Sequence, residues 1–115
     1  MGSKPPFRPI HLGRKLRQIR LAFGLSQAEI LEPLGAEQYL TSARISEYET
    51  GIRQPSLWIL LAYARMARIH LEILIDDEAT LPDQLPGNFD FGRYRQNAAK
   101  REREGGRYDS VDHTN

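Results

Sequence analysis

Apolar residues recur along the first part of the chain at intervals of three and four positions, which is typical of amphipathic helices. This stripe predicts a helix over residues 11–23, and it consists of Leu12, Leu16, Ile19 and Phe23. Gly24 follows directly. Glycine is favoured just after a helix because it readily adopts the left-handed conformation found there, so we expect the helix to end before Gly24.

The next segment, residues 25–55, predicts two short helices joined by a turn. Ser26 is followed three positions later by Glu29, a capping-box pattern that predicts a helix over residues 26–32. Pro33 lacks an amide hydrogen, so we expect this helix to end or distort near residue 32. After a turn over residues 35–39, Thr41 is the expected N-cap of a helix that ends before Gly51. This layout is a helix-turn-helix.

Two more helices are predicted, over residues 56–67 and 70–75, with Trp58 and Tyr63 partly buried and His70 as a cap. The last helix is unusually apolar for the end of a small domain. Its apolar residues are therefore candidates for a homodimer interface, with a cap on the monomer core as the alternative; they are Ile69, Leu71, Ile73, Leu74 and Ile75. The expected fold is an all-α, compact five-helix bundle.

The two ends of the chain have a different composition. Three prolines within residues 1–10 predict an extended, flexible arm before the domain. From residue 78 onward, proline and glycine interrupt a segment with few aliphatic residues, which predicts a mostly disordered tail over 78–115 with a weak helical pattern over 94–104. The predicted domain occupies residues 11–77.

Length and composition exclude several classes of protein. A chain of 115 residues suits one domain, and the absence of cysteine excludes disulfides, thiolate metal ligands and thiol nucleophiles. No apolar run approaches the roughly 20 residues that cross a bilayer, and the N-terminus lacks a signal-peptide pattern. We therefore expect a soluble cytoplasmic protein with no membrane partner.

The net charge is only +1, but the basic residues are concentrated near the N-terminus. No acidic residue precedes Glu29. A locally positive surface is what contact with phosphate requires, although a solvated helix face would have the same composition. The basic residues before Glu29 are Lys4, Arg8, Arg14, Lys15, Arg17 and Arg20.

The helix that begins after Thr41 has one apolar side and one polar side. Ile45 and Tyr48 are expected to face the core. On the opposite side, the side chains of the first turn are small. This turn is where a helix inserted into a DNA groove comes closest to the base edges. This opposite side, the front of the helix, consists of Ser42, Ala43, Arg44 and Glu47.

Two stretches of sequence carry a family resemblance. Leu-Ser-Gln at 25–27 and Ile-Ser-Glu-Tyr-Glu-Thr-Gly-Ile-Arg-Gln-Pro-Ser at 45–56 resemble the phage-repressor-like helix-turn-helix family, also called the XRE or Cro/C1 family. The resemblance covers roughly residues 12–75. It implies a lambda-repressor-like fold of five helices whose third helix enters the major groove of double-stranded DNA.

The resemblance also implies roles for individual residues. Gln27 and Thr41 would contact phosphate or nearby bases, and Arg53 matches a phosphate-contact position. The positions that read bases are occupied by Ser42, Ala43 and Glu47. Arg20 and Glu49 would form a structural ion pair between the first and third helices. Together with Arg17 and Arg44, these residues make up the predicted DNA-binding site.

The sequence departs from the family pattern between Gly35 and Ile45, where the turn is four residues longer than usual. Leu31 also stands where the family usually has alanine. Serine can bond either base type, the methyl group of alanine suits thymine, and a glutamate can accept from cytosine N4 while repelling phosphate. None of the base-reading positions has glutamine or asparagine, the side chains that pair with adenine, so recognition of adenine is less obvious.

The sequence thus predicts a sequence-specific DNA-binding transcriptional regulator, acting as a repressor and a homodimer. The alternative is an antitoxin whose tail binds a protein partner while the domain regulates its own operon. An enzyme is not expected, and neither catalytic residues, cofactors nor metal ligands are predicted. His11, His70 and His113 are far apart, and the acidic cluster at 76–78 suits a solvated helix end.

Overall fold

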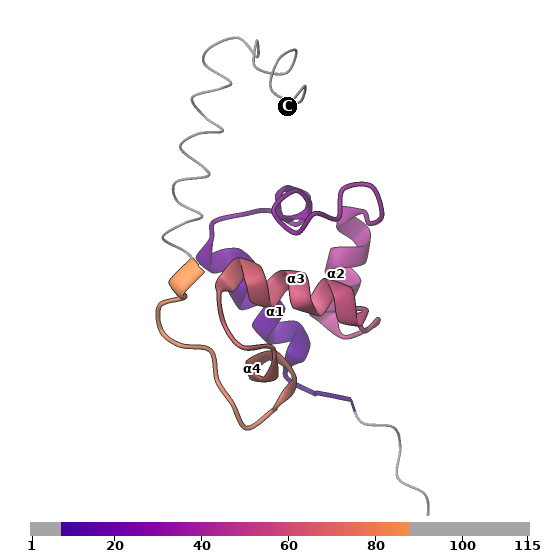
Figure 1. Cartoon of the computed structure of the whole chain (residues 1–115). Helices are drawn as coiled ribbons and strands as arrows, with labels where there is room; N and C mark the ends of the chain where they lie inside the picture. The colour runs from indigo at the N-terminus through magenta and orange to yellow at the C-terminus, as the bar shows by residue number, and fades with distance from the viewer. Residues whose placement is uncertain (1–7, 88–115) are drawn as a thin grey trace, which may run out of the picture.

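The computed structural model describes residues 8–87, which contain four α-helices, one short 3-10 helix and no strand. Figure 1 shows α3 crossing α1, with α2 to one side and α4 below. The helices are α1 (Leu12–Ala22), η1 (Glu29–Leu31), α2 (Ser42–Thr50), α3 (Leu57–Ala67) and α4 (Leu71–Ile75). None of the described helices is long and apolar enough to span a membrane. Most of the predicted arm and tail, including the helix predicted over 94–104, lies outside the described residues.

The central element is α1, which contacts α2, α3 and α4. Its predicted stripe is buried, because Leu16 and Ile19 are fully inaccessible and Leu12 and Phe23 nearly so. The core continues past α4, where Leu85 is buried against the same cluster. The other buried apolar side chains of this core are Leu25, Ile30, Leu34, Ala36, Ile45, Tyr48, Leu60, Tyr63, Ala64, Ala67 and Leu74.

The ends of α2 follow the predicted capping chemistry. The Thr41 hydroxyl accepts a hydrogen bond from the amide of Arg44, which satisfies one of the free amides at the helix start. At the other end, Gly51 has φ of 85°, a left-handed conformation that a residue with a side chain adopts only with strain. The bounds of α2 are therefore set by local sequence.

The helix predicted over residues 26–32 is wrong as an α-helix. The capping box exists, since Glu29 bonds the Ser26 amide and the Ser26 hydroxyl bonds the Glu29 amide. The backbone then tightens, because the Leu31 amide bonds the Ala28 carbonyl three residues back. Pro33 has no amide hydrogen to continue an α-helical ladder. The described chain consequently has four α-helices and the single turn η1 instead of the predicted five-helix bundle.

Two aromatic residues of α3 differ from their predicted partial burial. Trp58 is 78% exposed, whereas Tyr63 is completely inaccessible. The Tyr63 hydroxyl has no hydrogen-bond partner among the described residues. This burial raises the pKa of Tyr63, because the phenolate would be poorly solvated.

The orphaned hydroxyl gives a stability prediction. Tyr63→Phe should raise the free energy of unfolding by about 1 kcal/mol, because a buried polar group without a partner costs about 1–3 kcal/mol. Urea denaturation at neutral pH measures the change. A loss of stability of similar size would contradict the orphaned state of this hydroxyl.

Two charged residues tie α4 to the start of α1, and neither contact was predicted. Asp77 was expected at a solvated helix end, but its carboxylate accepts hydrogen bonds of 3.0 Å from the amides of both Ile10 and His11. Lys15 was expected on a positive surface, but it is buried. Its ammonium donates to the carbonyls of Ile73 (2.7 Å) and Asp76 (2.9 Å). The end of α4 is thus fixed against α1 by side chains.

These bonds predict a pH dependence of stability. The amides of Ile10 and His11 lower the pKa of Asp77 in the folded protein, because they bond its ionised form. The stabilisation is therefore fully present above the ordinary aspartate pKa of about 4 and is lost as the pH falls through the lower folded value. Between roughly pH 5 and pH 2, the urea midpoint should fall more steeply in the native protein than in Asp77→Asn. Asp83→Asn, an exposed carboxylate nearby, should retain the native pH profile.

Candidate nucleic-acid interface

The candidate interface is the outward face of α2. Ile45 and Tyr48 anchor the helix in the core. Ser42 and Ala43 lie exposed at its first turn, Arg44 follows them half-buried, and Glu47 is half-buried about one turn further along. The structure therefore holds α2 by one side and leaves small side chains at the tip of the other. A helix of this kind can approach a surface closely with its N-terminal turn.

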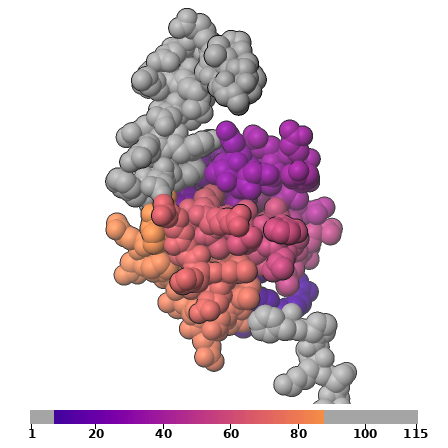
Figure 2. Space-filling view, viewed as in Figure 1, coloured from indigo at the N-terminus to yellow at the C-terminus, as the bar shows by residue number. Residues whose placement is uncertain are grey.

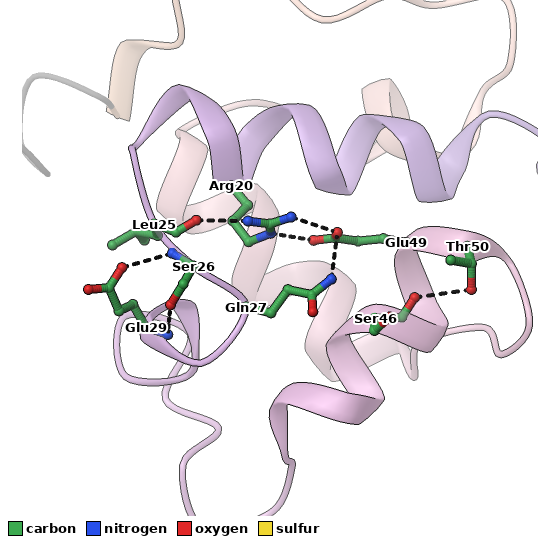
Figure 3. Close-up of polar contacts among 8 residues, drawn as sticks. All are labelled: Arg20, Leu25, Ser26, Gln27, Glu29, Ser46, Glu49 and Thr50. Carbon is green, nitrogen blue, oxygen red and sulfur yellow. Dashed lines mark hydrogen bonds and ion pairs between the residues drawn. The ribbon is translucent and has the colours of Figure 1, made fainter.

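A nearly buried ion pair fixes α2 to α1 (Figure 3). Arg20 Nε lies 2.7 Å from Glu49 Oε2, and the Arg20 NH2 nitrogen lies 3.0 Å from Oε1. The side chains of Arg20 and Glu49 are only 10% and 3% exposed. The third guanidinium nitrogen donates to the Leu25 carbonyl at 2.9 Å. The hydrogen bond with Glu49 raises the pKa of Arg20.

Gln27 belongs to the same network. Its amide nitrogen donates to Glu49 Oε1 at 3.2 Å, as Figure 3 shows. Glu49 thereby connects three parts of the chain, which are α1, the segment before η1 and the last turn of α2. Gln27 is predicted to contact phosphate or nearby bases, and the structure places it half-buried beside the ion pair.

Arg44, Glu47 and Arg53 form a second, partly exposed cluster on the front of α2. Glu47 Oε1 lies 3.0 Å from Arg44 Nε in an ion pair, and it accepts a hydrogen bond from Arg53 Nε at 3.2 Å. The Arg53 amide also bonds the Glu47 carbonyl, which orients the loop after α2. A glutamate predicted to read bases is therefore paired with two arginines of the predicted DNA-binding site.

The remaining predicted residues, Thr41 and Arg17, are both exposed. Thr41 is exposed and its hydroxyl caps α2. Arg17 is exposed on α1. Figure 2 shows that the surface of residues 25–40 adjoins that of α2. The longer turn, which precedes α2, thus lies next to the predicted base-reading residues Ser42 and Ala43 at the start of that helix.

A positively lined hollow of about 220 Å³ lies beside the C-terminal end of α2. Arg8, Arg14 and Arg53 contribute to its walls, and the Arg8 guanidinium bonds the Gly51 carbonyl at 3.4 Å. The sequence indicates a run of basic residues near the N-terminus but does not indicate where this run lies in the folded domain. The fold brings part of that run next to the loop that follows α2.

The sequence of this domain matches a known protein family. A model described as a helix-turn-helix domain matches residues 11–72, which is more than half of the 115-residue chain. The chain belongs to the helix-turn-helix domain family. The match begins one residue before α1 and ends within α4, so this helix-turn-helix domain includes the ion pair and the whole front of α2. No curated protein and no solved structure matches the chain.

Membership of the family indicates a DNA-binding regulator. Domains of this kind typically bind DNA and are not usually enzymes. In this helix-turn-helix domain, the segment before α2 contains η1 where the sequence predicted an α-helix. Any residue of this segment that contacts DNA would therefore be positioned by a loop and the turn η1, as well as by the packing of α2.

Proposed function

We propose that this protein is a sequence-specific transcriptional repressor of the phage-repressor (XRE or Cro/C1) type, which inserts α2 into the major groove of double-stranded DNA. The main supporting observation is the outward face of α2. Its first turn is small and exposed, and the buried pair of Arg20 and Glu49 holds the helix in one orientation. A recognition helix requires this combination, because base contacts depend on the angle at which the helix enters the groove.

The base-reading positions in this proposal are Ser42 and Ala43. A serine hydroxyl can donate to or accept from a base edge, and the methyl group of alanine can pack against the thymine methyl. Thr41, Gln27 and Arg17 are proposed to contact the sugar-phosphate backbone. The Gln27 amide carries a second N–H besides the one that bonds Glu49, and that group is the proposed phosphate donor.

Arg44 and Arg53 are proposed to contact phosphates and to contribute affinity for any sequence. Arg44→Ala and Arg53→Ala should each weaken binding to all duplexes, because phosphate contacts carry no direct sequence information. Each change should also reduce the slope of log K against log salt concentration by about one. Fluorescence anisotropy with labelled duplexes over a salt series measures both quantities.

Arg65→Ala provides the control, since Arg65 is exposed on α3 outside this front. Its binding should match that of the native protein. Loss of affinity for one sequence alone in Arg44→Ala or Arg53→Ala would show that the arginine reads bases, contrary to the proposed phosphate role.

We also propose that the protein acts as a homodimer, since palindromic operators are bound by two-fold symmetric proteins. The apolar residues of α4 contribute mainly to the monomer core, with Leu74 buried and Leu71 and Ile75 packed against it. Large exposed apolar side chains lie instead around the loop after α2 and the start of α3. They are Ile52, Leu57 and Trp58. Analytical ultracentrifugation with and without DNA tests this proposal.

A further inference from the structure

The arrangement of Glu47 between two arginines bears on how the front of α2 meets DNA. One carboxylate oxygen, Oε1, is shared by Arg44 and Arg53, at 3.0 and 3.2 Å. The side chains of Arg44, Glu47 and Arg53 are 39%, 37% and 54% exposed. All three charges therefore face solvent on the surface that the proposed function turns toward DNA.

Such exposed ion pairs are weak and exchangeable. Water and salt screen them, so a guanidinium can leave a carboxylate for another anion at little cost. DNA phosphates offer the same type of charge-assisted bond to the same nitrogens. Glu47 and a phosphate thus compete for Arg44 and Arg53, and the Glu47 charge repels the backbone when the arginines transfer to it.

We propose that Glu47 limits the sequence-independent part of DNA binding by competing with phosphate for Arg44 and Arg53. This inference rests on the proposed DNA-binding function and changes the role of Glu47 from a base reader to an electrostatic restraint. With Glu47 present, the cluster has a formal charge of +1, from two arginines and one glutamate. Binding then depends more heavily on the contacts of Ser42 and Ala43, which a random sequence does not satisfy.

The test is Glu47→Gln, which keeps the size of the side chain but removes its charge. The full chain and the variant are titrated with a labelled duplex of random sequence at 50 and 200 mM salt. Removing one negative charge from the interface should steepen the slope of log K against log salt by about 0.9. The variant should bind more tightly at 50 mM salt, and its advantage should shrink about 3.5-fold between 50 and 200 mM salt.

Glu72→Gln is the matched control. It changes the net charge by the same amount from an exposed position on α4. Its affinity and salt slope should remain close to those of the native protein. A similar gain in both variants would show that total charge is responsible and would overturn the role of the Glu47 cluster.

The outcomes separate this inference from the proposed function. Equal affinities of the native protein and Glu47→Gln for random DNA would overturn the inference while leaving DNA binding intact. A changed sequence preference with no change in random-DNA affinity would restore the base-reading role and would also overturn it. Failure of both proteins to bind any duplex at low salt would overturn the inference and the proposed function together.

Discussion

Glu49→Ala is expected to lower the free energy of unfolding by about 3–5 kcal/mol, because it leaves a nearly buried guanidinium without its carboxylate. Arg20 is only 8% exposed and forms two bonds to Glu49, at 2.7 and 3.0 Å. Gln27 loses its acceptor in the same variant. Urea denaturation monitored by circular dichroism measures the loss.

Glu47→Ala is the matched comparison within α2. It removes an exposed carboxylate that also bonds arginine, so its cost should be no more than about 1 kcal/mol. Replacing both buried partners, as in Arg20→Met with Glu49→Leu, should recover much of the stability, since no unpaired charge remains. Equal effects of Glu47→Ala and Glu49→Ala would contradict a structural role for the buried pair.

Gly13→Ala should destabilise the protein by about 1–3 kcal/mol, although alanine normally favours a helix over glycine by about 1 kcal/mol. A Cβ at position 13 would lie 2.6 Å from the Glu49 carbonyl oxygen and 2.8 Å from that of Tyr48. Both are backbone atoms of α2, so relief requires α1 and α2 to separate. The same denaturation assay measures the change.

Gln18→Ala, at an exposed position of α1, is the control and should alter stability by less than about 0.5 kcal/mol. The predicted sign for Gly13→Ala is opposite to that of helix propensity. An increase in stability would therefore show that the two helices do not approach as closely as the structure indicates.

The positions of α1, α2, α3 and α4 could be predicted because each depends on local signals. Apolar spacing marks the buried faces, and residues such as Thr41 and Gly51 mark the ends. The segment around η1 could not be predicted to the same degree. There the capping box of Ser26 and Glu29 favours a helix while Pro33 opposes one, and the structure contains only a 3-10 turn.

The candidate site was predictable mainly where helical spacing places residues on one face. Ser42, Ala43, Arg44 and Glu47 follow from the period of α2. The pairing of Glu47 with Arg53 depends on the path of the loop after Gly51, so sequence alone gives no such distance. The same limit applies to Lys15, whose charge suggests a surface residue although its ammonium bonds carbonyls at the end of α4.

The proposed function of this helix-turn-helix protein is the recognition of a particular DNA sequence. Its most direct test is the binding of the full chain to labelled DNA from upstream of its own coding region, compared with unrelated DNA of equal length over a salt series. We predict that the upstream DNA binds roughly 10³-fold more tightly or better, with a moderate salt slope. Equal, weak and steeply salt-dependent binding to both DNAs would contradict the claim.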